Sequence, residues 1–106
     1  MTSEDNAADL LIAQAQKSFA EGFAGVIKLA PDGAPPVWVD GRTTPPAVIA
    51  HEPEDHPADC QWRGSSDALM RVLESEKALE SDYLSGRVFI SGDMSVMARL
   101  SMKAHR

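Results

Sequence analysis

The sequence predicts a single α+β domain spanning residues 1–106, with a mainly antiparallel sheet and its helices gathered on one face. Two observations support this fold class. Short β-rich runs separated by turn signals fill the stretch from residue 24 to residue 64. Segments with helical periodicity precede and follow that stretch. The order is one helix, a β meander, two helices, a strand and a last helix, which is typical of an α+β domain.

The first helix is expected from residue 4 to about residue 21. Ser3 is a suitable N-cap, and Glu4 and Asp5 complement the helix dipole in the first turn. Apolar residues then recur at every fourth position from Ala7 to Phe19. Gly22 is expected to end the helix.

Four short β-rich runs follow, with the sequences AGVIKLA, PVWVDG, PAVIAHE and ADCQWRG. Proline- and glycine-bearing turn signals separate them, which indicates an antiparallel meander of three or four strands. Alternation places Val37 with Val39, and Cys60 with Trp62, on one face of the sheet.

The second half is mainly helical. Ser65 or Ser66 is expected to cap a helix whose apolar face carries Ala68, Leu69, Val72 and Leu73. The run Glu74–Glu76 is compatible with its continuation. A helical turn from Ala78 to Ser85 then ends at Gly86. The strand Arg87–Ser91, the turn at Gly92, the cap Asp93 and a last helix from Met94 complete the chain.

Composition excludes several function classes. The net charge is −6 and the ten Lys and Arg residues are scattered, which argues against nucleic acid and against anionic membrane surfaces. The start lacks the basic region of a signal peptide, and no apolar run is long enough for stable membrane insertion. The single cysteine fits a reducing compartment, so a cytoplasmic location is expected.

The segment HEPEDHPADC at residues 51–60 is the densest group of polar side chains. His51, His56 and one carboxylate offer a candidate metal site. However, the histidines are five residues apart and Pro53 forbids the helix that an HExxH site requires. A solvated polar loop between two strands is the favoured interpretation, and no metal is expected.

Cys60 is a candidate nucleophile with His56 as its base. Because Cys60 alternates with Trp62, a buried small hydrophobic residue is favoured instead. Helix capping explains Ser65 and Ser66, and there is no GxSxG or phosphate-binding loop. The sequence therefore predicts a protein that is not an enzyme and that needs no cofactor.

Methionines are frequent in the C-terminal half. Met suits adaptable apolar surfaces, and Met94 and Met97 share one face of the last predicted helix. Ordinary core packing is the alternative, and physical chemistry alone favours it.

An ordered set of residues from Asp59 to Leu100 resembles the sterol carrier protein 2 (SCP-2) sterol-transfer family. It begins with Ala58-Asp59-Cys60 at a strand and Ser66-Asp67-Ala68-Leu69 at a helix start. The family's sequence pattern for the strand and helix that follow the third helix is matched by Ser85, Gly86, Arg87, Val88, Ile90, Gly92, Asp93, Ala98, Arg99 and Leu100.

The resemblance implies a five-stranded sheet covered by helices, with an apolar tunnel between them that takes a sterol, fatty acid, acyl-CoA or similar lipid. It carries no catalytic residue and no metal ligand. Alternation and helix faces in this sequence give the expected lining, which is Trp62, Leu69, Val72, Leu73, Leu84, Val88, Ile90, Met94 and Met97. The alternative function is a protein-interaction or accessory module with the same fold and a filled core.

Self-association is a further expectation. The chain is short for this family, so a second subunit is expected to close the tunnel as a homodimer. Phe89, whose neighbours Val88 and Ile90 point to the other face, and Met102 are the apolar groups expected to pair. Packing of Phe89 under the first helix is the equal alternative.

Overall fold

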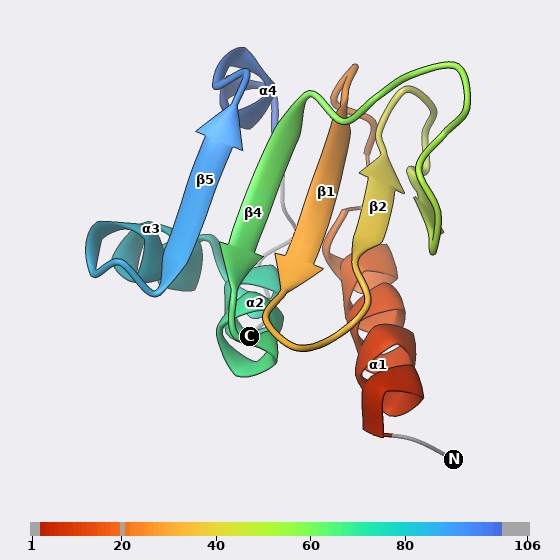
Figure 1. Ribbon diagram of the computed structural model, residues 1–106. Helices are drawn as coiled ribbons and strands as arrows, with labels where there is room; N and C mark the ends of the chain where they lie inside the picture. Colours follow the sequence, from red (N-terminus) through yellow and green to blue (C-terminus); the bar gives the residue numbers. More distant parts are fainter. Residues whose placement is uncertain (1–2, 20, 101–106) are drawn as a thin grey trace.

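The computed structural model describes residues 3–19 and 21–100, and all its helices lie against one face of a five-stranded sheet (Figure 1). The elements in chain order are α1 (Ser3–Ser18), β1 (Val26–Pro31), β2 (Val37–Asp40), β3 (Ala47–Ile49), β4 (Cys60–Gly64), α2 (Ser66–Glu74), α3 (Glu76–Leu84), β5 (Val88–Gly92) and α4 (Ser95–Ala98). The predicted α+β class and the five-stranded sheet are confirmed.

The sheet is mixed, with the strand order β3-β2-β1-β4-β5. The pairs β1–β2, β2–β3 and β4–β5 are antiparallel, whereas β1 and β4 run parallel at the centre. Of the two alternatives, three or four strands, the meander has three, because β4 pairs parallel to β1. Residues 50–59 instead carry the chain across to the far side of β1, and such a crossover is what a parallel pair requires.

The helix-facing side of the sheet supplies half of the core. Val37 and Val39 on β2, and Cys60 and Trp62 on β4, are buried while their neighbours are not, so the predicted alternation is confirmed. Leu11 of α1, Phe19 directly after that helix and Leu69 of α2 close the core from the other side.

The opposite face of the sheet is open. Phe89 is 56% exposed there, and the Arg63 guanidinium lies 5.5 Å from the centre of its ring. Of the two alternatives for Phe89, the exposed position is the one observed.

Serines set the limits of the central helices. The Ser65 hydroxyl accepts a hydrogen bond from the Ala68 N–H at 3.0 Å, so Ser65 is the N-cap of α2. Ser75 has an extended backbone, and its hydroxyl accepts a hydrogen bond from the Lys77 N–H at 3.1 Å. The helical run was expected to continue through Ser75, but this second cap breaks it there and starts α3 in a new direction.

The last helix is shorter than predicted. Asp93, the predicted cap, accepts hydrogen bonds from the Ser95 N–H at 2.9 Å and from the Ser95 hydroxyl, but the N-cap of α4 is Met94. However, α4 is a single turn, and the chain continues from it to Leu100 through turn-like bonds. Met102 lies outside the described residues.

Three side chains join α3 to its neighbours. The Asp82 carboxylate on α3 is 3% exposed and lies 3.0 Å from the Arg71 guanidinium of α2. The Arg87 guanidinium, just before β5, lies 3.5 Å from the other oxygen of the same carboxylate. A buried carboxylate with two cationic partners thus fixes α3 between α2 and β5.

None of the helices within residues 3–19 and 21–100 has the length and apolar character that a bilayer crossing demands.

We predict that Asp82→Asn lowers the free energy of unfolding by about 1–3 kcal/mol, because it leaves buried polar groups with weaker partners. Glu80→Gln on the same helix is the control, since the Glu80 side chain is exposed and should cost no more than about 0.5 kcal/mol. Urea denaturation of both variants measures the difference. Equal stabilities would show that the ion pairs do not hold α3.

Candidate functional site

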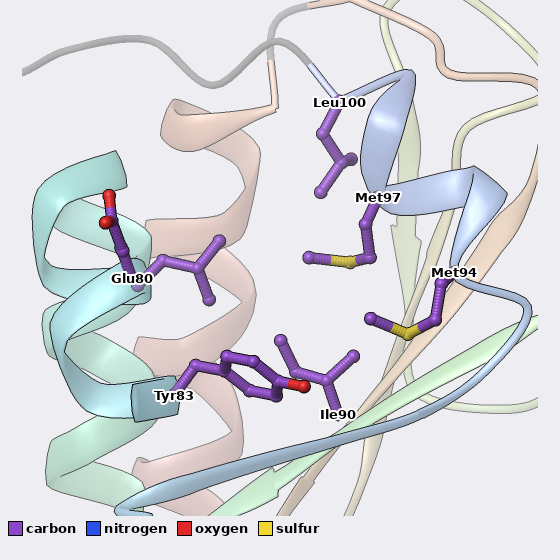
Figure 2. A pocket seen from close by; sticks show the side chains of 7 residues that line it. Glu80, Tyr83, Ile90, Met94, Met97 and Leu100 are labelled. Carbon is purple, nitrogen blue, oxygen red and sulfur yellow. The ribbon is translucent and has the colours of Figure 1, made fainter. Parts of the chain in front are cut away.

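A cavity of about 360 Å³ opens between α3, β5 and α4 (Figure 2). This volume falls at the lower end of the range of roughly 300–1,000 Å³ that small-molecule sites occupy. Its walls are mainly apolar. The lining residues are Leu79, Glu80, Tyr83, Ile90, Met94, Met97 and Leu100.

Two of the walls follow from helical and strand periodicity. Leu79 and Glu80 of α3 lie four and three residues before Tyr83, and residues at these spacings are neighbours on a helix surface. Ile90 lies two residues after the buried Val88 on β5, so it points to the helix-facing side of the sheet. In Figure 2 the Tyr83 ring extends from α3 toward Ile90.

The third wall, α4, is positioned by Asp59 at the start of β4. The Asp93 N–H donates to the Asp59 carbonyl at 2.7 Å. Gly92 has a φ of +102° and lies so close to that carbonyl that a side chain at this position would collide with it. Val96 of α4 is fully buried against the sheet, which leaves Met94 and Met97 to face the cavity.

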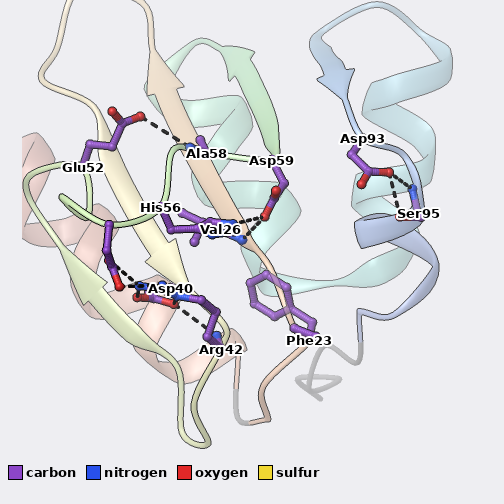
Figure 3. Close-up of polar contacts among 12 residues, drawn as sticks. Phe23, Val26, Asp40, Arg42, Glu52, His56, Ala58, Asp59, Asp93 and Ser95 are labelled. Atoms are coloured by element: carbon purple, nitrogen blue, oxygen red, sulfur yellow. Dashed lines mark hydrogen bonds and ion pairs between the residues drawn. The ribbon is translucent and has the colours of Figure 1, made fainter.

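Asp59 is itself held by hydrogen bonds to its carboxylate (Figure 3). The Val26 N–H and the His56 Nε2–H each donate to the same oxygen at 2.9 Å. Burial raises the pKa of this carboxyl, but the hydrogen bonds from His56 and Val26 outweigh it and hold the pKa below the ordinary value. Asp59 therefore stays ionised. Its carboxylate holds the start of β1, and its backbone carbonyl holds Asp93 at the approach to α4.

A second polar cluster lies beside it, between the end of β2 and the loop before β4 (Figure 3). The Arg42 guanidinium pairs with Asp40 at 2.7 Å and with Asp55 at 3.1 Å. The hydrogen bond from Arg42 lowers the pKa of the Asp40 carboxyl. Asp55 thus fixes this loop to β2 through Arg42.

The nine residues predicted to line a lipid site fall into three groups. Ile90, Met94 and Met97 do line the cavity. Leu84 is 75% exposed on the outer side of α3. The remaining five are buried in the closed core, and they are Trp62, Leu69, Val72, Leu73 and Val88. One contact links core and cavity, since the Trp62 Nε1–H donates to the Met97 sulfur at 3.2 Å. A lipid-binding role for these nine residues stays a prediction.

Sequence reasoning missed Leu79, Glu80, Tyr83 and Leu100. The spacing of Leu79 and Tyr83 was a usable signal, because an i, i+4 apolar pair marks the inner side of a helix. On a continuous helix, Leu100 would lie one turn after the buried Val96. It turns back to the cavity because α4 ends after one turn and the helical register is lost.

The residues singled out for chemistry are dispersed. His56 is bonded to Asp59, and the His51 ring is exposed. No three His, Cys, Asp or Glu side chains gather in a metal-binding arrangement within the described part of the chain. Cys60 is buried, which raises the pKa of its thiol and makes it a poor nucleophile.

Solved structures with this fold include a protein described as UbiJ-SCP2, a ubiquinone synthesis protein. It is 15% identical, the match covers 92% of this chain and 84% of that one, and the TM-score is 0.58. Sterol carrier protein 2 from Yarrowia lipolytica, in its apo form, is 16% identical, with coverages of 83% and 75% and a TM-score of 0.56. Sterol carrier protein domain 2 of Helicoverpa armigera is 15% identical, with coverages of 92% and 72% and a TM-score of 0.54.

At these identities the three structures establish the fold alone. A comparison with curated proteins found no match. The sequence model of one family, however, matches residues 7–104, which is nearly the whole chain. The resemblance seen in the strand and helix pattern is confirmed: the chain belongs to the SCP-2 sterol transfer family.

Proposed function

We propose that the protein binds and carries an apolar ligand in the cavity between α3, β5 and α4, without transforming it. The observation that carries the proposal is the apolar lining of this cavity at the edge of the sheet, in a chain whose family is described by sterol transfer. An apolar pocket with few polar groups is the usual form of a lipid or small-molecule site.

The cavity sets a scale for the ligand. A volume of about 360 Å³ holds roughly a dozen groups of the size of a water molecule, at about 30 Å³ each. Each methylene of the ligand that leaves water contributes about 0.8 kcal/mol to the free energy of binding. An alkyl chain that fills the cavity therefore gains ample stabilisation before the costs of association are counted. Association entropy and chain ordering offset much of it, which points to micromolar affinity.

The methionines suit this role. Met94 is 46% exposed at the mouth, and Met97 is half-buried behind it. Because unbranched thioether side chains adopt several rotamers, they adjust to ligands of different shape. Broad tolerance of chain type is therefore expected.

Two features support binding without catalysis. Among the described residues, the lining contains one carboxylate and one phenol but no paired nucleophile and base. The thiol and the imidazole that were candidates for chemistry lie elsewhere, in the core and in the loop before β4. We place this activity in the cytoplasm, on the strength of the single buried cysteine.

The alternative, an accessory module that acts only through its surface, requires no ligand cavity. Titration of the unmodified protein with a fluorescent lipid separates the two functions, because a module of this kind takes up none.

We predict that Ile90→Trp weakens lipid binding at least tenfold. The indole fills the cavity from the rigid strand β5, and exclusion of about two methylenes costs roughly 1.6 kcal/mol. The measurement is displacement of a fluorescent lipid by dodecanol, with thermal unfolding to verify that the variant is folded.

Phe89→Trp is the matched control, because it adds an indole to the same strand on the opposite, open face. It should leave the affinity unchanged. Full binding by folded Ile90→Trp protein would place the ligand elsewhere.

Self-association through the open face is the second part of the proposal. We predict a homodimer at micromolar concentration, with the exposed Phe89 in its interface, since a pairing surface buries apolar groups that otherwise face water. Analytical ultracentrifugation measures this, and Phe89→Ser should shift the protein to monomer. A wild-type monomer with the same sedimentation as the variant would end the idea.

A further inference from the structure

The two edges of the sheet differ in how they are protected. At one edge, β3 is three residues long and directly follows Pro45 and Pro46. Short length and proline are two features that keep an edge strand from pairing with another chain. At the other edge, β5 has five residues, VFISG, with no charge and no proline. The edge of β5 is therefore suited to pairing with a further strand.

The direction of the backbone groups on β5 follows from the strand beside it. The Gly64 carbonyl accepts the Asp32 N–H on the side of β1, and the Asp59 carbonyl accepts the Asp93 N–H on the side of β5, both at 2.7 Å. Because these directions alternate along a strand, the odd-numbered residues of β4 face β5. They lie opposite the odd-numbered residues of β5, such as Phe89. The odd-numbered residues of β5 thus bond to β4, and the even-numbered ones face outward.

The outer edge of β5 is a row of hydrogen-bonding groups. Val88, Ile90 and Gly92 direct their backbone N–H and C=O groups to it. Gly92 is exposed although it has no side chain, so solvent reaches its backbone directly. Such a row offers donors and acceptors in the alternating order that another strand satisfies.

We propose that β5 pairs with β5 of a second copy as an antiparallel strand, about a two-fold axis at Ile90, so that the two sheets join into one. The inference rests on the proposed self-association and gives it a geometry. Ile90 lies opposite Ile90 of the second copy, and Val88 lies opposite Gly92 of the second copy. All the outward backbone groups of the strand then have partners.

The charges at the two ends of β5 select this register. Arg87 directly precedes the strand and Asp93 directly follows it. About an axis at Ile90, Arg87 lies opposite Asp93 of the second copy, and two-fold symmetry forms this contact twice. A slip by two residues, the smallest that keeps the helices of both copies on one side of the sheet, separates both pairs of charges.

Both charged side chains are accessible. The Arg87 side chain is 60% exposed, and its Nη1 contacts Asp82 and Ser85. Asp93 is exposed, and its Oδ1 accepts hydrogen bonds from Ser95. Opposite charges across two strands stabilise the pair, whereas like charges destabilise it. Exposed ion pairs contribute little affinity, so their role here is to set the register.

Edge pairing also brings the two candidate sites together. Ile90 lines the cavity and lies at the axis, so the cavities of the two copies adjoin on the same side of the joined sheet. Phe89 stays on the open side, opposite Ser91 of the second copy, and remains part of the interface.

Amide hydrogen exchange of the wild-type protein, followed by nuclear magnetic resonance at low and high protein concentration, tests the pairing without any substitution. We expect exchange of the Ile90 N–H to slow at least about tenfold at the higher concentration, because the second copy accepts its hydrogen bond. The Phe89 N–H faces β4 in both states and is the internal reference. The ratio of the two exchange rates is the quantity measured.

Disulfide trapping tests the register. The Cα atoms of a hydrogen-bonded antiparallel pair are about 5.5 Å apart, which a disulfide can bridge. We expect oxidised glutathione to convert Ile90→Cys into a covalent dimer on non-reducing electrophoresis. Ser91→Cys is the matched control, because Ser91 is exposed on the open side and lies opposite Phe89 of the second copy. The wild type controls for the buried Cys60.

Three outcomes decide between the inference and the self-association on which it rests. Cross-linking of Ser91→Cys but not of Ile90→Cys places the contact across the open face or in another register, and overturns this inference alone. A wild-type dimer whose Ile90 N–H exchanges at the same rate, relative to Phe89, at both concentrations has the same consequence. A wild-type protein that sediments as a monomer at both concentrations contradicts the proposed self-association itself.

Discussion

The candidate site depends on the ion pairs of the buried Asp82 carboxylate. The carboxylate lies between Arg71 of α2 and Arg87 at the start of β5, so one side chain fixes the position of α3 against two neighbours. Because the ion pairs hold α3 at the N-terminal end of β5, the helix does not close over the strand's other end. The cavity occupies the space that remains between α3 and α4.

Asp59 has the corresponding role on the other side of the cavity. Its backbone carbonyl accepts the Asp93 N–H, and its carboxylate joins β1 and His56. Asp59 thus couples the loop before β4 to the short helix that bears Met94 and Met97. Two acidic residues far apart in the sequence therefore define opposite walls of one apolar space, although neither lines it.

Local chemistry made much of the fold predictable. The Ser65 cap, the alternation of Val37 with Val39 and the ordered motif from Ser85 to Asp93 all depend on neighbours in the sequence, and all were recovered. The parallel pairing of β1 with β4 was not, because strand direction across residues 50–59 is decided by tertiary contacts. The lining was recovered only in part for the same reason. The apolar helix face that carries Leu69 and Val72 shows that these side chains are buried. It does not show whether they pack against protein or against a ligand.

The central claim is that the space between α3, β5 and α4 receives the apolar ligand. Nuclear magnetic resonance of the labelled methionine methyl groups during titration with dodecanol tests it most directly. Met94 and Met97 line the cavity, whereas Met70 packs against the core on α2 and serves as the internal reference. The account predicts that the Met94 and Met97 signals shift together with saturation while Met70 keeps its position. Binding of dodecanol that leaves the Met94 and Met97 signals in place would contradict it.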